Sequence, residues 1–358
     1  MRKISKAVSL SLSLLIFVQL LTGCSDSQSD PSQTNANTEQ TAAVSSQETG
    51  STQGDLSFEP ILKDYKLSNP NSDENTVKLY NYLCECYGNV MISCQQESTW
   101  MGSPDYEMNY IEEKTGKLPA MRGLDFMNDD FDGVVQRSKE WHDKGGIVTI
   151  CWHTGVNGKG YQESLDDNPS FNKLLTEGTD EYNGMMASWD RAAKALQELR
   201  DAGVPVIWRP FHEFDGEWFW WGKGGAENFK KLWILMYEKF TNEYNLTNLI
   251  LILGYSGTVK SNWYPGDEYC DVLGSDSYDN SINKKGFSML QRVTKAPKPL
   301  AFHECGNLPA VTDFKDNGAL WSWFMVWHTE HIMGNNVNNL KEVYNSDLVI
   351  TLDEVNIK

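Results

Sequence analysis

Two segments of the sequence place a glutamate directly after an apolar run and a histidine. Both read Phe-His-Glu, at 211–213 and at 302–304. Two carboxyl groups on either side of one bond can cleave a glycosidic linkage, because one protonates the leaving oxygen while the other attacks the anomeric carbon. An isolated glutamate at a strand end is most often a solvated rim residue. Two glutamates at the ends of two apolar runs, each beside aromatic residues, favour a catalytic pair instead. Glu213 and Glu304 are therefore the candidate catalytic carboxylates.

Other polar and aromatic side chains also follow apolar runs. In barrels of parallel strands, the carboxyl ends of the strands form one face, and that face carries the chemistry. We therefore expect these side chains to gather around the two glutamates. They are Gln95, Asp125, Trp152, His153, His212, Tyr255, Asp276, Tyr278, His303, Trp327 and His328.

Eight short apolar segments must position these residues. Several are nearly continuous runs of Val, Ile and Leu, as expected for parallel strands buried on both faces. Helical patterns lie between them, for example at 189–202 and 228–244. This alternation predicts an α/β fold, a (β/α)8 TIM barrel; an open doubly wound sheet is the alternative, but no GxGxxG follows the first strand. The segments are 90–95, 118–126, 147–153, 204–213, 249–256, 271–278, 299–304 and 321–328.

The residues around both glutamates resemble those of a known family. Trp208-Arg-Pro-Phe-His-Glu213-Phe-Asp-Gly-Glu-Trp218-Phe-Trp-Trp-Gly222 is similar to the fourth-strand signature of glycoside hydrolase family 26, the β-mannanases. Lys298-Pro-Leu-Ala-Phe-His-Glu304-Cys-Gly306 resembles its seventh-strand signature. The resemblance covers about residues 56–358. It implies a retaining endo-β-1,4-mannanase that hydrolyses mannan, glucomannan or galactomannan by double displacement.

Carried over residue by residue, the resemblance implies roles for individual side chains. Glu213 would be the acid/base and Glu304 the nucleophile. His212 would contact sugar hydroxyls beside the acid, and Trp218 would pack at the catalytic subsite. The other implied substrate contacts are His153, Asp276, Tyr278 and Trp327, with the Tyr278 hydroxyl near the nucleophile. The family usually has another residue at position 303, so His303 has no implied role.

We expect no cofactor and no metal. Adjacent strand residues point to opposite faces, so the two His-Glu pairs do not form a chelate, and no HxH or HExxH spacing occurs. Trp220, Trp221 and Trp233 are expected in the core or the walls of the fold. His142 and His331 are expected to be solvated surface residues.

The composition limits the class of ligand. The formal net charge is −18, which argues against nucleic-acid binding because phosphate contacts need clustered Lys and Arg. Aromatic residues make up 12% of the chain, including 13 Trp, and suit stacking on the apolar faces of a sugar. We expect a polysaccharide as the partner and a monomeric protein.

The first residues resemble an export signal. A basic start and an apolar run end in Leu21-Thr22-Gly23-Cys24, which resembles a bacterial lipobox. We expect a signal peptide at 1–23, a lipidated Cys24, a flexible Ser/Thr/Gln-rich linker at 24–55 and the catalytic domain at 56–358. The chain would then be anchored through lipid at the extracellular face of a bacterial membrane.

The six cysteines besides Cys24 show no CxxC pair. Most lie in apolar runs, so we expect buried free thiols.

Two alternatives remain open from the sequence. The first is another β-glycanase of the same family, a β-1,3-xylanase or a mixed-linkage β-glucanase. The second is a sugar-binding lipoprotein without catalysis, which would share the anchor, the linker and the aromatic residues but would not need the two matched glutamates.

Overall fold

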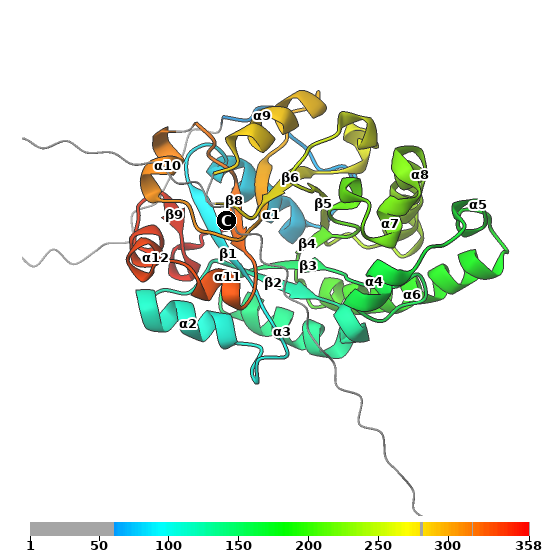
Figure 1. Cartoon of the computed structure of the whole chain (residues 1–358), viewed down its shortest axis with the longest axis horizontal. Coiled ribbons are helices and arrows are strands. Elements are labelled where there is room, and N and C mark those ends of the chain that lie inside the picture. Colours follow the sequence, from blue (N-terminus) through cyan, green and yellow to red (C-terminus); the bar gives the residue numbers. More distant parts are fainter. Residues whose placement is uncertain (1–60, 280–281, 317, 358) are drawn as a thin grey trace, which may run out of the picture. The chain divides into compact units, whose positions relative to one another are not determined.

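The strands form one closed parallel sheet. The computed structural model describes residues 61–279, 282–316 and 318–357. Neighbouring strands follow chain order from β1 to β8, and β1 pairs with both β2 and β8, which closes the ring inside the helices (Figure 1). The predicted TIM barrel is therefore confirmed. The strands are β1 (Met91–Gln96), β2 (Met121–Asp125), β3 (Ile147–Cys151), β4 (Val206–Arg209), β5 (Leu249–Tyr255), β6 (Val272–Ser277), β7 (Leu300–Cys305), β8 (Trp323–Val326) and β9 (Val349–Ile350).

All eight predicted strands are present, with two differences. The fourth ends at Arg209 rather than at Glu213, because the chain turns sharply at Pro210 and the next residues leave the sheet. The short strand β9, which we did not predict, pairs with the start of β1. Two residues are too few to give a recognisable alternation in the sequence.

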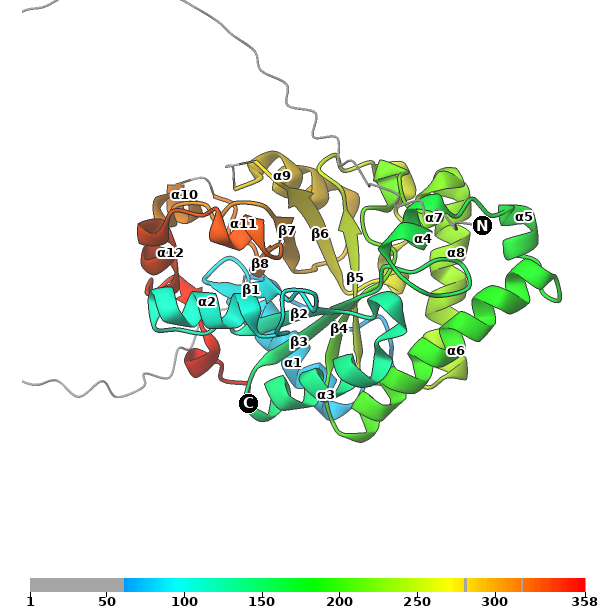
Figure 2. The ribbon, with the colours of Figure 1, turned by 60° about the horizontal axis from the view of Figure 1, so that its bottom comes forward.

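The helices cover the outer face of the barrel (Figure 2). The predicted helix at 189–202 is the second half of α6. This helix begins at Asp180, directly after Thr179, whose side chain accepts a hydrogen bond from the Tyr182 amide. The predicted helix at 228–244 is α8 followed by one π-helical turn at Lys239–Glu243. The helices are α1 (Glu74–Cys86), α2 (Tyr106–Thr115), α3 (Phe131–Asp143), α4 (Tyr161–Asp166), α5 (Phe171–Leu174), α6 (Asp180–Asp201), α7 (Trp220–Lys223), α8 (Gly225–Glu238), α9 (Lys284–Val293), α10 (Val311–Asp316), α11 (Glu330–Met333) and α12 (Val337–Tyr344).

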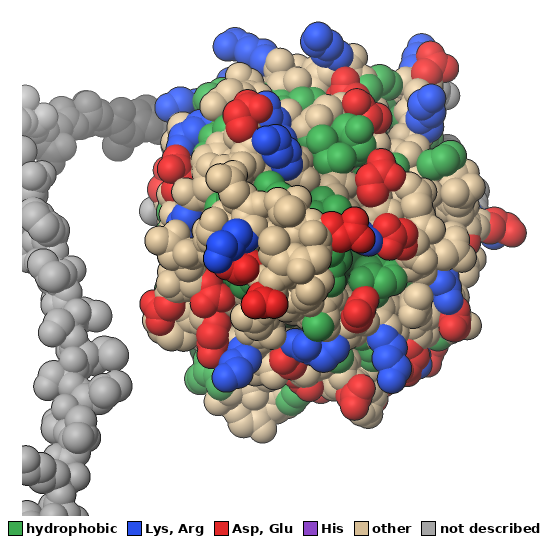
Figure 3. Space-filling view, turned by 90° about the vertical axis from the view of Figure 1, so that its right-hand side faces the viewer, with side chains coloured by type: hydrophobic (Ala, Val, Ile, Leu, Met, Phe, Trp, Pro, Cys, Tyr) green, Lys and Arg blue, Asp and Glu red, His purple; other side chains and the backbone are tan. Residues whose placement is uncertain are grey.

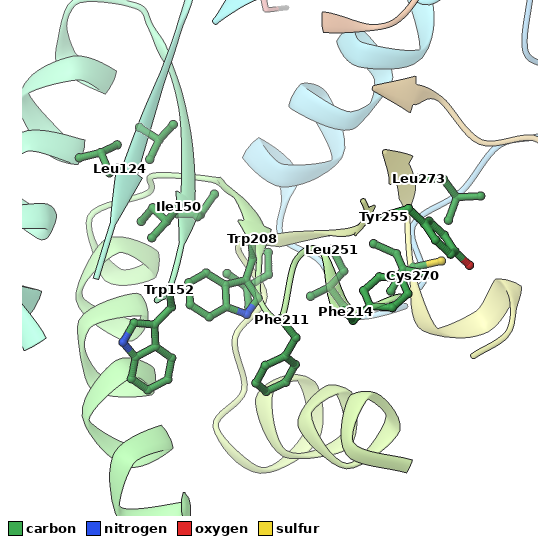
Figure 4. Packing of buried hydrophobic residues seen from close by; sticks show 14 of the residues in the cluster. Leu124, Ile150, Trp152, Trp208, Phe211, Phe214, Leu251, Tyr255, Cys270 and Leu273 are labelled. Atoms are coloured by element: carbon green, nitrogen blue, oxygen red, sulfur yellow. The ribbon is translucent and has the colours of Figure 1, made fainter. Parts of the chain in front are cut away.

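Alternate strand residues form two separate apolar cores. The outward-facing set, including Leu124, Ile150 and Trp208, packs against the helices (Figure 4). The inward-facing set, including Ile207 and Ile252, packs inside the barrel together with residues of α1. Burial of both faces explains why the strands read as continuous apolar runs.

A bulge in β7 changes the direction of its last side chains. Ser275 pairs with Phe302 and Ser277 pairs with Cys305, so two residues of β7, His303 and Glu304, face one residue of β6. Phe302 and Cys305 both lie in the outward-facing core, and the two residues between them both point into the barrel. The expectation that adjacent residues point to opposite faces is therefore wrong at this position.

Several further expectations can be compared with the described residues. Cys84, Cys86, Cys94, Cys151, Cys270 and Cys305 are buried free thiols, as predicted. No helix in the described ranges is long and apolar enough to cross a membrane. Acidic and basic side chains are interspersed on the face shown in Figure 3, without a continuous basic patch there. The predicted signal peptide, Cys24 and linker lie outside the described residues.

Candidate active site

The fourth strand delivers Glu213 through a strained turn. Phe211 and Glu213 both have positive φ, 51° and 53°, a conformation that is rare for residues other than glycine and often marks functional sites. The amide of Glu213 donates to the carbonyl of Gly254 on β5, at 2.8 Å. Behind the turn, the indole N–H of Trp221 donates to the carbonyl of His212. These bonds hold the turn against the barrel and place the Glu213 carboxyl at its mouth.

Glu304 is buried between two hydrogen-bond donors. Its Oε1 accepts from the guanidinium of Arg209 at 3.0 Å, and its Oε2 accepts from the hydroxyl of Tyr278 at 2.8 Å. Both Arg209 and Glu304 are almost fully buried. The two oxygens of Glu304 thus accept from one buried cation and from one neutral donor. Burial and the charge of Glu304 raise the pKa of Tyr278, so that its hydroxyl keeps the proton that it donates.

Glu213 has the opposite environment. Burial, and then the charges of Asp276 and Glu304, raise the pKa of its carboxyl. Its carboxyl accepts from the indole N–H of Trp218, which lies 3.1 Å from Oε2. The pKa of Asp276 is also raised, by burial and by the charge of Glu304. The site therefore holds one carboxyl group that accepts from a guanidinium and a hydroxyl, and a second, Glu213, whose pKa is raised.

Two histidines extend the site beside Glu304. The Nε2 atoms of His212 and His153 are 3.0 Å apart, and Nδ1 of His153 lies 2.6 Å from Oδ2 of Asp125. Burial, followed by the neighbouring His153, lowers the pKa of His212 well below its usual value. For His153, burial lowers the pKa, but the charge and hydrogen bond of Asp125, together with the charges of Glu304 and Glu213, outweigh it, and the net shift is upward. Nε2 of His212 is 4.0 Å from Oε1 of Glu304, so the pair lies next to the carboxylate.

A cavity of about 460 Å³ opens beside these residues. Trp327 follows β8 and lines it, with its ring 6.1 Å from that of His153. Trp100, about half exposed, lies edge-on to His328 at 4.7 Å between ring centroids. The lining residues include Gln96, Glu97, Trp100, Asp125, His153, Tyr161, Trp327, His328, Glu330 and His331.

The structure brings together all eight side chains predicted for the site. Glu213 accepts from Trp218, while Glu304 accepts from Tyr278 and lies 4.0 Å from His212. Asp276 is the next-to-last residue of β6, close enough to both glutamates for their charges to interact, and His153 and Trp327 line the cavity.

Some residues differ from their expected positions. His142 and His331 are half-buried rather than solvated: His331 lines the cavity, and its ring packs 5.2 Å from that of Tyr278, while His142 lines a second cavity, apart from the carboxylates. Trp220, Trp221 and Trp233 are buried, as predicted.

Arg209 and Gln96 were not recognised from the sequence. Arg209 lies two positions after the inward-facing Ile207, and Gln96 lies two positions after Cys94, so a period of two identifies both as interior residues. Their side chains meet at 2.9 Å, and Gly123 leaves the space for Gln96, since a Cβ there would lie 2.4 Å from its amide oxygen.

Two groups of side chains have the spacing of metal ligands. They are Asp125, Cys151 and His153, and Asp276, His303 and Glu304. In each group the histidine Nδ1 already lies 2.6 Å from a carboxylate oxygen, and in the second group the guanidinium of Arg209 also contacts His303 and Glu304. The positive charge beside this second group is thus the guanidinium of Arg209, a side chain of the protein itself.

Comparisons with known proteins identify the family of the chain. The model of glycosyl hydrolase family 26 matches residues 68–354. A mannan endo-1,4-beta-mannosidase of Thermothelomyces thermophilus is 33% identical over 81% of this chain and 63% of its own length. Mannan endo-1,4-beta-mannosidase B of Piromyces sp is 30% identical over 81% of this chain and 53% of its own length. The chain thus spans only about half to three fifths of these curated relatives.

Solved structures give the same result. The crystal structure of a ruminal GH26 endo-beta-1,4-mannanase superposes with a TM-score of 0.76 at 33% identity and covers 82% of this chain and 71% of that one. A beta-mannanase from a symbiotic protist of the termite Reticulitermes speratus, complexed with gluco-manno-oligosaccharide, gives 0.74 at 30% identity, over 83% and 100%. On these matches, the chain belongs to glycosyl hydrolase family 26.

Proposed function

We propose that the protein is an endo-β-1,4-mannanase that hydrolyses mannan with retention of configuration. The observation that carries the proposal is the contrast between the two carboxyl groups. Glu304 is held by two donors, whereas burial and neighbouring carboxylates raise the pKa of Glu213. The relatives described above are mannanases, which supports mannan as the substrate.

In the first step, a carboxylate oxygen of Glu304 bonds to the anomeric carbon while the bond from that carbon to the leaving oxygen breaks. Glu213 gives its proton to this oxygen, so the leaving sugar departs as an alcohol. The indole N–H of Trp218 holds the Glu213 carboxyl in place during the transfer.

In the second step, Glu213, now ionised, takes a proton from a water molecule. The water oxygen bonds to the anomeric carbon, and the bond to Glu304 breaks with its electrons returning to the carboxylate. Arg209 and the Tyr278 hydroxyl stabilise that returning charge. Two inversions give net retention.

The side chains that can bind the sugar lie around the two carboxylates and the cavity. His212 and Asp276 lie beside the carboxylates and can bind hydroxyls of the reacting sugar, with His153 next to His212. Trp218 and Trp327 offer ring faces on which a pyranose can stack. The enzyme needs no cofactor for this chemistry.

A product profile tests the substrate assignment. The protein is incubated with β-1,4-mannan, β-1,3-xylan and mixed-linkage β-glucan, alongside Glu304→Gln as an inactive control. We expect oligosaccharides from mannan and none from the control. Products from xylan or glucan alone would move the assignment to one of the other activities of the family, and sugar binding without products would indicate the non-catalytic lipoprotein.

We also propose that the protein is lipid-anchored at Cys24 on the extracellular face of a bacterial membrane and acts as a monomer. The basic start, the apolar run and Leu21-Thr22-Gly23-Cys24 support the anchor. Expression of Cys24→Ser should move the protein from the detergent-extracted fraction to the soluble one, and light scattering of the soluble form should give the mass of one chain.

A further inference from the structure

His303 occupies a slot that the barrel keeps open for it. The imidazole is fully buried, with Nδ1 2.6 Å from Oδ1 of Asp276 and Nε2 3.0 Å from the guanidinium of Arg209. Two glycines on neighbouring strands leave the space. A Cβ at Gly254 would lie 2.7 Å from the ring, and one at Gly274 would lie 2.6 Å from Cβ of His303. The two glycines leave room for the ring of His303, and the bulge in β7 turns Glu304 inward beside it, where an ordinary strand would turn that residue outward.

Asp276 and Arg209 determine which nitrogen of the His303 ring carries the proton. Arginine has no acceptor, so the contact with Arg209 requires a lone pair on Nε2 of His303. The proton of the neutral ring is then on Nδ1, and it is donated to Asp276. Burial, followed by the charge of Arg209, lowers the pKa of His303 to about 3, which agrees with a neutral ring. His303 is thus a permanent donor to one oxygen of Asp276.

Asp276 and Glu213 share an environment that does not favour two charges. Burial and Glu304 raise the pKa of Asp276, and burial, Asp276 and Glu304 raise that of Glu213. After burial, the charge of Asp276 is the largest cause of the raised pKa of Glu213, so an ionised Asp276 favours a proton on Glu213. Oδ1 of Asp276 is held by His303, and its Oδ2 is buried with no hydrogen-bond partner among the described residues. A fixed N–H donor on Asp276 favours the same distribution.

We propose that His303 is a positioning residue that keeps Asp276 as the charged partner and so leaves the proton on Glu213. The proposal rests on the proposed function, in which Glu213 donates that proton to the leaving oxygen. The charged and titratable groups that face His303 are Arg209 from β4, Asp276 from β6 and its neighbour Glu304, with the ring of His212 at 6.0 Å.

A leaving-group comparison tests this role. His303→Phe fills the slot but donates no hydrogen bond, so Asp276 should take up the proton and Glu213 should become ionised. General acid catalysis contributes roughly 10² to 10⁴-fold. We expect the kcat on mannan to fall about 100-fold or more, and the kcat on an aryl β-mannoside with a good leaving group to fall less than about tenfold. The alkaline limb of the kcat/KM profile should move to lower pH, because Glu213 no longer faces a charged Asp276.

Two further variants separate this role from packing. His303→Asn can place an N–H near the position of Nδ1, and it should recover much of the activity on mannan. His142→Phe is the matched control, since His142 lies in another cavity, and it should keep the leaving-group dependence of the wild type. Equal losses on mannan and on the aryl substrate in folded His303→Phe, with an unshifted alkaline limb, would overturn the proposal.

A measurement without turnover distinguishes a failure of this inference from a failure of the proposed function. In ¹⁵N-histidine-labelled wild-type protein, NMR should show His303 with a protonated Nδ1 and an unprotonated Nε2, unchanged between about pH 5 and 8. A ring that titrates in this range, or that is protonated on Nε2, would contradict the inference even if mannan is hydrolysed. If His303 has the expected tautomer but the protein does not hydrolyse mannan, the result would count against the proposed function alone.

Discussion

Replacing Glu213 by glutamine should stabilise the folded protein at neutral pH. A glutamate in an unfolded chain releases its proton near about pH 4.3. Burial, Asp276 and Glu304 raise the pKa of Glu213 in the folded protein, so the folded state holds a proton that the unfolded state has released. Stability then falls as the pH rises between the unfolded and the folded pKa, by about 1.4 kcal/mol per pH unit for one proton.

The magnitude follows from this slope. Between pH 5 and 7, the wild type should lose about 2.7 kcal/mol of unfolding free energy relative to Glu213→Gln, which has no proton to release. Glutamine also keeps an oxygen that can accept from the indole of Trp218. The variant should therefore unfold at a higher temperature than the wild type at pH 7, and at nearly the same temperature at pH 5.

Thermal and urea unfolding at several pH values provide the assay. Glu177→Gln is the matched control, because Glu177 is exposed on the surface, and its difference from the wild type should not change with pH. A difference for Glu213→Gln that stays constant from pH 5 to 7, or that favours the wild type at pH 7, would refute the reasoning on which the acid is assigned.

Three other predictions concern the chemistry. Proton NMR of the first product from a mannan oligosaccharide should show the β-anomer; an initial α-anomer would exclude double displacement. Glu304→Ala should lose nearly all turnover on every substrate, and azide should restore activity on an aryl mannoside by forming the α-mannosyl azide, whereas recovery through a β-azide would contradict its role as nucleophile. Tyr278→Phe removes one donor from Glu304 and should lower kcat about tenfold or more with the KM changed less; a change confined to KM would assign Tyr278 to sugar binding only.

Much of the fold was readable from the sequence because both faces of each strand are buried. The continuous apolar runs marked all eight strands, and their alternation with helices gave the barrel. The residues at which the strands end were harder to predict. Aromatic residues continue past Arg209, so the run at 204–213 looks like one strand, although the chain leaves the sheet and Glu213 adopts a positive φ.

The candidate site was partly predictable. The residues at the ends of strands were found because their types stand out after apolar runs. The interior contacts that Arg209 makes with Gln96 and His303 were not, because they depend on which way each side chain points. At 303–304 the bulge reverses the usual alternation, and the sequence shows no sign of it except the glycines at 254 and 274, whose role appears only when the strands are neighbours.

The most direct test of the account is to trap the glycosyl-enzyme intermediate. A 2-deoxy-2-fluoro-β-mannosyl substrate with a good leaving group forms this intermediate and hydrolyses it slowly, so it labels the nucleophile. After proteolysis, mass spectrometry should place the sugar on the peptide that contains Glu304, and saturating mannan oligosaccharide should slow the labelling. A label on another residue, with Glu304 unmodified, would contradict the assignment of the two carboxyl groups.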